Sequence, residues 1–169
     1  KLIGDYVQKG KVITPAQSIK TYTQKQMHFS YDYSILHQTK DIVLSATFRL
    51  KSDNSSNLHK IGKKAVQRRV DTQPLNIPSS GCIFQNITKK QAEKINAPTQ
   101  STGYLIDQAN LKGKTIGGAQ ISTKHANFIV NKGNATFQDV QKLIKLIKKE
   151  LKQKYNLTPK LEIFILGQT

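Results

Sequence analysis

The spacing of apolar positions predicts strands near the start of the chain. Apolar residues within 2–7 and 12–14 flank the segment 9–11 (KGK), a turn signal, and this pattern predicts a hairpin whose second arm ends at Pro15. Residues 41–50 (DIVLSATFRL) combine β-branched with polar side chains, which predicts a further strand. The beginning of the chain is therefore expected to be rich in β-structure.

A linker and a basic helix are predicted next. Residues 52–57 (SDNSSN) have the polar composition of a linker. Apolar side chains then recur at helical spacing, and two arginines stand near the end of the same stretch; these residues are Leu58, Ile61, Ala65, Val66, Arg68 and Arg69. Two prolines and a glycine in residues 73–84 exclude a regular helix and predict an extended loop that enters a short strand.

Short helices and strands alternate in the rest of the chain. The pattern predicts a helix over 101–110 that closes at Gly113, a tight turn within 115–119, and strands over 127–131 and 161–166. The strongest helical pattern follows Thr136, which has the spacing of a capping-box pair with Asp139. The apolar stripe of that helix is Phe137, Val140, Leu143, Ile144, Ile147 and Leu151, and the lysines between these positions are expected to be solvated.

These elements predict an α+β protein in three parts. Residues 1–52 are β-rich, residues 53–75 form a linker and a helix, and residues 76–169 form a small α/β unit. The 169 residues suffice for one domain or two small ones. No apolar run approaches the roughly 20 residues that a membrane-spanning helix needs, so no membrane partner is expected.

The charge balance is strongly basic. Lys and Arg number 27 against 10 Asp and Glu, a formal net charge of +17. Such an excess favours polyanionic partners, although a lysine-rich surface on an ordinary protein explains it equally well. The excess is mostly lysine, is spread along the chain, and accompanies no nucleic-acid-binding motif. Nucleic acid is therefore an unlikely partner.

Cys82 is a candidate for chemistry because it follows a Pro-Ser-Ser-Gly loop. A thiol presented there could be a nucleophile or a proton donor, whereas a lone cysteine is more often a small buried hydrophobic residue. A pairing with His125 would give the couple of a cysteine hydrolase, but no local motif supports it. The four histidines and the single cysteine indicate no metal site and exclude an internal disulfide.

Two other features carry weaker signals. The Gly117-Gly118 pair is a faint hint of a phosphate-binding loop and matches no complete fingerprint. Glu162 lies in an otherwise apolar segment. Strand alternation would place its carboxylate in solvent, whereas a carboxylate on an inward face would be costly and indicate function.

Motifs in the second half of the chain resemble one enzyme family in their order and spacing. They are residues 73–86 (QPLNIPSSGCIFQN), 103–113 (GYLIDQANLKG), 116–131 (IGGAQISTKHANFIVN) and 133–140 (GNATFQDV). Together they resemble the C-terminal part of UDP-N-acetylenolpyruvoylglucosamine reductases, the MurB flavoenzymes of peptidoglycan precursor synthesis. Residues 29–50 resemble the close of that family's flavin-binding region.

The resemblance implies a fold and an activity. Residues 1–52 would be the remnant of an FAD-binding domain, and residues 76–169 the substrate-binding domain. The implied enzyme is a cytoplasmic oxidoreductase of the UDP-N-acetylmuramate dehydrogenase type, which uses FAD and NADPH to reduce the enolpyruvyl group of a UDP-sugar. The main FAD-binding segment would precede Lys1, so the chain is expected to be a fragment that does not hold FAD by itself. The alternative is a basic, non-enzymatic module that binds a phosphate-bearing ligand or nucleic acid.

The resemblance also implies roles for five residues. Cys82 would be the general acid that protonates the reduced substrate, and Glu162 would assist proton delivery or polarise the developing enol. Asn86, Lys112 and His125 would contact the diphosphate and sugar of the substrate. The residues of a cofactor site are not implied.

Two positions depart from the family pattern. Asp32 stands where the family has an arginine that holds the enol oxygen or carboxylate, and Gln85 stands where it has a lysine. Replacing a cation by an anion removes electrostatic stabilisation of the transition state. These departures bear on catalysis more than on fold.

Overall fold

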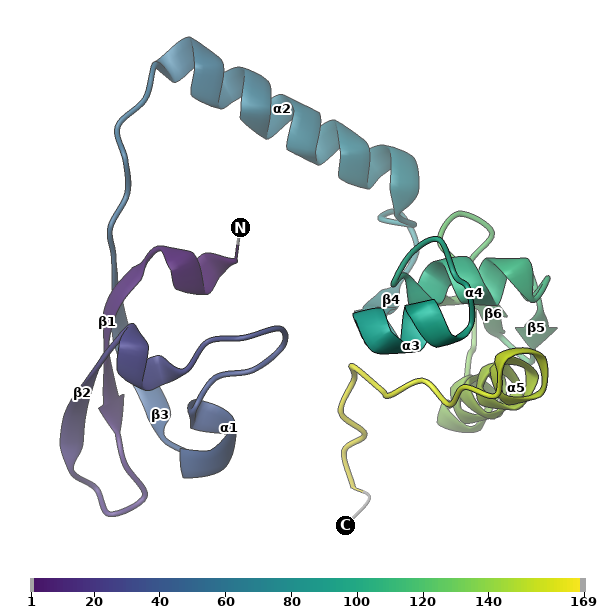
Figure 1. Ribbon diagram of the computed structural model, residues 1–169. Helices are drawn as coiled ribbons and strands as arrows, with labels where there is room; N and C mark the ends of the chain where they lie inside the picture. Colours follow the sequence, from purple (N-terminus) through teal and green to yellow (C-terminus); the bar gives the residue numbers. More distant parts are fainter. Residues whose placement is uncertain (1, 168–169) are drawn as a thin grey trace. The chain divides into compact units, whose positions relative to one another are not determined.

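The computed structural model describes residues 2–167 and divides into two compact units, Lys1–Leu58 and His59–Thr169 (Figure 1). The division falls inside helix α2 (Ser55–Thr72), within the segment 53–75 for which the sequence predicts a linker and a helix. Helices and strands occur in both units, which confirms the α+β class.

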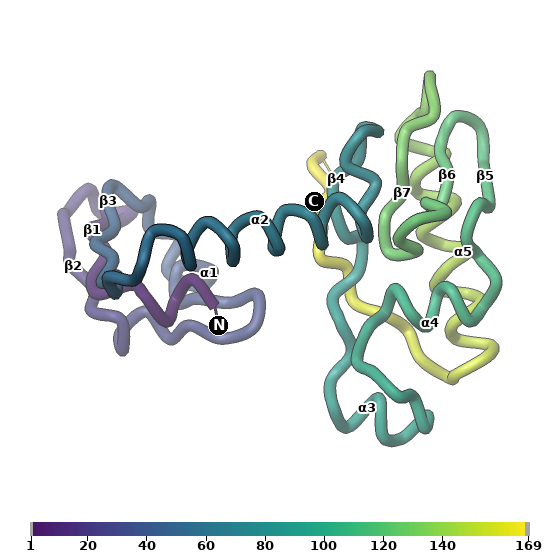
Figure 2. Tube along the Cα trace, turned by 90° about the horizontal axis from the view of Figure 1, so that it is seen from above, coloured from purple at the N-terminus to yellow at the C-terminus, as the bar shows by residue number. Residues whose placement is uncertain are grey.

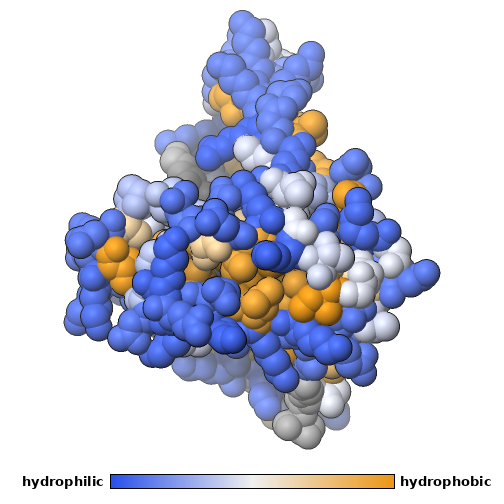
Figure 3. Space-filling view, turned by 90° about the vertical axis from the view of Figure 1, so that its right-hand side faces the viewer, coloured by the Kyte–Doolittle hydropathy of each residue, from blue (hydrophilic) through white to orange (hydrophobic). Residues whose placement is uncertain are grey.

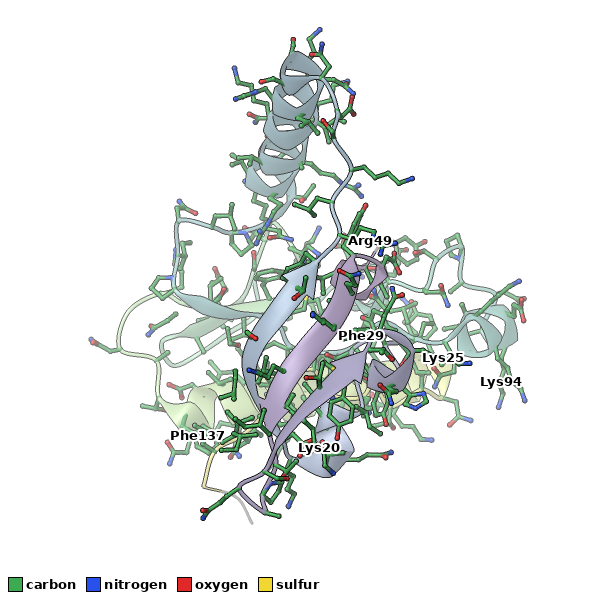
Figure 4. All side chains as sticks on the ribbon, turned by 90° about the vertical axis from the view of Figure 1, so that its left-hand side faces the viewer. Lys20, Lys25, Phe29, Arg49, Lys94 and Phe137 are labelled. Carbon is green, nitrogen blue, oxygen red and sulfur yellow. The ribbon has the colours of Figure 1, made fainter. Side chains whose placement is uncertain are left out.

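Unit 1 is a three-stranded antiparallel sheet with short helical turns. The strands β1 (Val7–Ile13), β2 (Ile19–Thr23) and β3 (Ile42–Phe48) lie in the order β2-β1-β3. Two 3₁₀ turns, η1 (Ile3–Asp5) and η2 (Lys25–Met27), and the short helix α1 (Leu36–Thr39) complete the unit. Figure 4 shows this sheet, with Lys20 on β2 and Arg49 just beyond β3.

The hairpin predicted at residues 9–11 is wrong, because β1 runs straight through Gly10. A Cβ on Gly10 would lie 2.8 Å from the Met27 side chain, so the glycine makes room for a buried neighbour instead of forming a turn. The turn lies further along the chain, where Thr14 N–H donates to the Ser18 carbonyl at 2.9 Å. The residues after Pro15 then form β2, a strand that the sequence pattern did not indicate.

Unit 2 is built on a four-stranded antiparallel sheet flanked by helices. The strands β4 (Ser79–Cys82), β5 (Thr115–Ile116), β6 (Ala119–Ile121) and β7 (Phe128–Asn131) lie in the order β4-β7-β6-β5 (Figure 2). Helices α3 (Lys89–Lys94) and α4 (Thr102–Gln108) lie between β4 and β5 in the chain, and α5 (Phe137–Tyr155) follows β7. Of these, the sequence predicts α4, α5 and the strands near 82 and 128. It misses α3, and it predicts only the tight turn within 115–119, not the strands β5 and β6 on either side of that turn.

Helix α5 contributes much of the unit 2 core. Thr136 and Asp139 cap its start reciprocally, as their spacing predicts. Leu143, Ile147 and Leu151 are almost completely buried, whereas Phe137, at the first turn, stays exposed. Of the lysines on the predicted solvated face, 142, 145, 149 and 152 are exposed and Lys148 is half-buried. Figure 3 shows a surface on which hydrophilic residues predominate and apolar residues gather toward the middle.

The Gly117-Gly118 pair packs against the start of α5. Gly118 N–H donates to the Asp139 carboxylate at 3.4 Å, and a Cβ on Gly118 would lie 2.2 Å from the Gly133 carbonyl oxygen. Backbone hydrogen bonds hold the pKa of Asp139 below its usual value. These glycines therefore serve close packing, and the Asp139 carboxylate occupies the position that a bound anion would need.

The predicted strand over 161–166 is also wrong. Only Leu161 forms a bridge, opposite Phe84, and the residues after it follow bends and a turn. The Asn127 amide group bonds both the N–H and the carbonyl of Phe84, at 3.0 Å and 2.7 Å, on the edge that faces away from Leu161. The pairing with Leu161 uses the neighbouring residues Ile83 and Gln85 instead, and a longer ladder would have to run past Gly81, whose φ of +88° departs from strand geometry.

Candidate active site

A cavity of about 780 Å³ opens beside the end of β4. Its lining contains the Cys82 thiol and the Glu162 carboxylate, together with Arg69, Gln73 and Phe128. All of these residues belong to unit 2. The structure therefore places the two predicted catalytic residues in one cavity, although 80 positions separate them in the chain.

Backbone pairing with the segment after β4 brings Glu162 to the cavity. Glu162 N–H donates to the Ile83 carbonyl at 2.9 Å, and Gln85 N–H donates to the Lys160 carbonyl at 2.9 Å. Because Ile83 directly follows Cys82, this pairing fixes the carboxylate next to the thiol. Pro159 is buried just before the paired residues and limits the conformations of the chain there.

Asn127 holds the other side of Cys82. Its side chain is 3% exposed and hydrogen-bonds to Phe84, as described above, and also to the Cys82 thiol. Its carbonyl accepts from Ile83 N–H at 2.8 Å. Sequence reasoning missed this residue; the available signal was an amide side chain at the start of an otherwise apolar strand, where a buried polar group must find partners.

The surroundings of Cys82 favour the protonated thiol. Partial burial raises the pKa of Cys82, the negative charge of Glu162 raises it further, and the hydrogen bond from Asn127 opposes these effects. A thiol with a raised pKa remains protonated at neutral pH. This thiol is therefore suited to donating a proton and poorly suited to acting as a thiolate nucleophile.

Lys112 and His125 form a second group of predicted site residues. Lys112 Nζ lies 2.7 Å from Asp107 Oδ2, and the positive charge of Lys112 adds to burial in lowering the pKa of His125. The His125 ring packs edge-on against Phe128, with centroids 4.9 Å apart, and Phe128 in turn lines the Cys82 cavity. Neither Lys112 nor His125 lines that cavity itself.

The loop that carries His125 is held by hydrogen bonds to Ser122. Ser122 Oγ accepts from the N–H groups of Lys124 and His125 at 3.1 and 3.2 Å. Gly103 lies against the imidazole, since a Cβ there would be 3.0 Å from His125 Cε1. The helix α4 and this loop therefore fit closely around His125.

Asn86 lies beyond β4, at the start of α4 rather than in the Cys82 cavity. Its Oδ1 accepts from Thr102 N–H at 3.4 Å, while Thr102 Oγ1 donates to the Gln85 carbonyl at 2.6 Å. The side chain of Asn86 is exposed. The structure thus brings Cys82 and Glu162 together and places Asn86 apart from them.

Asp32 belongs to unit 1, where it occupies a tight turn. Ser30 and Tyr33 exchange backbone hydrogen bonds of 3.1 and 3.4 Å, and Asp32 between them has φ +49°. Aspartate tolerates this left-handed conformation better than most residues. The aspartate that departs from the family pattern therefore suits its local backbone.

Residues 2–167 meet the requirements of neither a metal site nor a membrane-spanning helix. No group of three or more His, Cys, Asp and Glu side chains there could hold a metal ion. No helix in the same range has the length and apolar character needed to cross a membrane.

Comparison with known proteins gives a consistent result. Residues 73–166 match the family model described as UDP-N-acetylenolpyruvoylglucosamine reductase, C-terminal domain. A reductase of that name from Lactobacillus helveticus is 42% identical over 166 residues, which is 97% of this chain and 52% of the relative. One from Bacillus pumilus is 40% identical over 161 residues, 95% of this chain and 50% of the relative. The chain thus spans about half the length of these relatives.

A solved structure agrees with these sequence matches. The crystal structure of UDP-N-acetylenolpyruvylglucosamine reductase (MurB) from Thermus caldophilus matches with a TM-score of 0.78 and 30% identity, covering 95% of this chain and 53% of that one. The resemblance seen in the sequence motifs is confirmed. The chain belongs to the UDP-N-acetylenolpyruvoylglucosamine reductase family and contains its C-terminal domain.

Proposed function

We propose that this chain forms the substrate-binding half of a UDP-N-acetylenolpyruvoylglucosamine reductase. The observation that carries the proposal is the shared cavity of Cys82 and Glu162, a protonated thiol beside a carboxylate. The names of the relatives supply the substrate, a UDP-sugar with an enolpyruvyl ether. The reaction adds a hydride to one carbon of the double bond and a proton to its neighbour.

Cys82 donates that proton. Hydride addition leaves negative charge on the neighbouring carbon and the attached carboxylate, and the Cys82 S–H bond then breaks as the new C–H bond forms. Proton donors work best when their pKa suits the operating pH. The raised pKa of Cys82 keeps the proton on sulfur until this step.

Glu162 keeps the thiol protonated and assists proton delivery. Its negative charge disfavours a thiolate in the resting site. Its backbone pairing with Ile83 fixes its position relative to the sulfur. Positioning of this kind matters because small displacements of catalytic groups slow reactions strongly.

Lys112, His125 and Asn86 bind the rest of the UDP-sugar. The Lys112 ammonium suits a phosphate oxygen. The lowered pKa of His125 leaves a neutral imidazole at pH 7, which suits hydrogen bonds with sugar hydroxyls or phosphate oxygens. The exposed Asn86 amide offers both a donor and an acceptor.

FAD, when bound, supplies the hydride chemistry, with NADPH as the source of electrons. The residues of unit 2 fit the substrate side of such a site. Unit 1 instead exposes the apolar side chains of β3 and its neighbours. An exposed apolar surface of this kind is typically covered by another layer of polypeptide. The flavin would be held mainly by polypeptide that corresponds to the N-terminal half of the relatives. We propose that the reaction takes place in the cytoplasm, because its cofactors and its nucleotide sugar are soluble.

Rapid kinetics on this chain joined to the N-terminal half of a relative test the proposal. Cys82→Ala should slow flavin reoxidation by substrate by about 10²- to 10⁴-fold, whereas Cys82→Ser should retain measurable turnover. Glu162→Gln should slow the same step and leave flavin reduction by NADPH intact.

Ser80→Ala is the matched control, because Ser80 is exposed, lies on the same strand β4 as Cys82, and is outside the cavity lining. Its rates should equal those of the unmodified enzyme. Equal rates for all Cys82 variants would remove the thiol from the mechanism, and unchanged substrate reduction in Glu162→Gln would remove the carboxylate.

A further inference from the structure

Arg69 is the one cationic residue among the described residues that line the Cys82 cavity. It lies in the last turn of α2 and is exposed to solvent. The adjacent Arg68 does not line the cavity. One of two neighbouring arginines therefore lines the cavity that holds the thiol and the carboxylate, and the other does not.

An anionic substrate needs such a cation. The enolpyruvyl group carries a carboxylate, and in this cavity it would approach the negative charge of Glu162. Two carboxylates at close range repel each other in a partly buried site. A guanidinium compensates for this repulsion and can bind a carboxylate through two parallel hydrogen bonds.

Three contacts hold the end of α2 where Arg69 reaches the cavity. Lys124 Nζ donates to the Val70 carbonyl at the open end of the helix, in the loop that also carries His125. Gln73 N–H donates to the Arg69 carbonyl at 2.8 Å, and Arg69 Nε donates to Gln73 Oε1 at 3.3 Å. Gln73 also lines the cavity, so the guanidinium is oriented from within the site.

We propose that Arg69 binds the carboxylate of the substrate's enolpyruvyl group, with Gln73 and Lys124 as its positioning residues. The inference rests on the proposed function, since it takes the substrate from there. It assigns to unit 2 a carboxylate-binding residue that is independent of the turn occupied by Asp32.

Calorimetric titration of the full 169-residue chain with two ligands tests this assignment. UDP-N-acetylglucosamine enolpyruvate carries the carboxylate, and UDP-N-acetylglucosamine lacks it. The unmodified chain should bind the first ligand more tightly. Arg69→Gln should weaken binding of the first ligand about tenfold and leave the second unchanged, with Arg69→Lys in between because it keeps the charge but not the planar fork.

Arg68→Gln is the matched control, since it removes the same charge from the next position. Circular dichroism confirms that each variant is folded. Three results would overturn the role of Arg69. Arg68→Gln could lose as much affinity for the first ligand as Arg69→Gln, Arg69→Gln could lose affinity equally for both ligands, or Arg69→Gln could lose no affinity at all. Failure of the unmodified chain to bind either ligand would instead contradict the proposed function.

Discussion

The two units of the chain differ sharply in how they bury apolar side chains. Unit 2 encloses a contiguous core whose members include Phe84, Leu105, Ile106 and Leu143. In unit 1 the buried hydrophobic side chains are Val7, Val12 and Met27, and every residue of β3 is exposed. Burial of apolar surface is the main driving force of folding, so unit 2 has a much larger source of stability of its own than unit 1.

This difference matches the division of labour in the proposed function. The thiol proposed as proton donor, the neighbouring carboxylate and the proposed substrate contacts all lie in the unit that has a core. The unit with a thin core has an apolar surface that includes Ile42, Leu44, Phe48 and Leu50. Covering that surface requires polypeptide beyond unit 1, and the relatives are about twice as long as this chain.

A matched pair of truncations should show the contrast most strongly. Leu143→Ala, in the core of unit 2, should destabilise that unit by about 2–5 kcal/mol, because it removes buried methyl groups and leaves a cavity. Leu44→Ala on β3 should change stability by less than about 0.5 kcal/mol, because Leu44 is 50% exposed. Urea unfolding followed by circular dichroism measures both.

Equal losses for these two variants would mean that unit 1 has a core of its own. The difference in apolar burial between the two units would then not correspond to a difference in their stability. Addition of the N-terminal half of a relative should make Leu44→Ala costly as well, since β3 would then be covered.

A pair of glycine substitutions should give a smaller contrast. Gly118→Ala should cost about 1–3 kcal/mol, because its Cβ would meet the backbone of Gly133 and Ala135. Gly62→Ala, in the exposed helix α2, has no atom within 4 Å of the new Cβ and should stabilise by up to about 1 kcal/mol. Thermal unfolding followed by circular dichroism measures the shifts, and a tolerated Gly118→Ala would contradict the close packing at the start of α5.

The sequence pattern correctly predicted those elements that depend on interactions between residues close together in the chain. The spacing of Leu143, Ile147 and Leu151 and the Thr136–Asp139 cap are sufficient to specify α5. The turn predicted at Gly10 was wrong because the sequence does not distinguish a glycine that makes room for the distant Met27 from a glycine in a turn. The strand prediction for 161–166 failed because side-chain alternation is a local pattern, whereas the length of the ladder depends on the facing chain, where Gly81 has a φ of +88°.

The site was predictable only through the family resemblance. Periodicity gives no reason to bring Cys82 and Glu162 together, since their proximity depends on a non-local pairing of Ile83 with Glu162. Asn127 lies inside the motif 116–131 but its role is not marked there, and Arg69 lies outside the motifs that carry the resemblance. Their roles follow from where the fold places them, beside the thiol and on the cavity wall.

The most direct test of the shared site uses the single cysteine of the chain. The rate of Cys82 alkylation by iodoacetamide, measured against pH, reports the thiol pKa because only the thiolate reacts. The midpoint should lie above that of an ordinary thiol. Glu162→Gln should lower it, since one cause of the raised pKa is removed, while burial keeps part of the shift.

Glu93→Gln is the control, because Glu93 is an exposed carboxylate on α3 that pairs with Lys89; its midpoint should equal that of the unmodified chain. The account predicts a lower midpoint in Glu162→Gln alone. The same midpoint in all three proteins would contradict the claim that Cys82 and Glu162 act in one site.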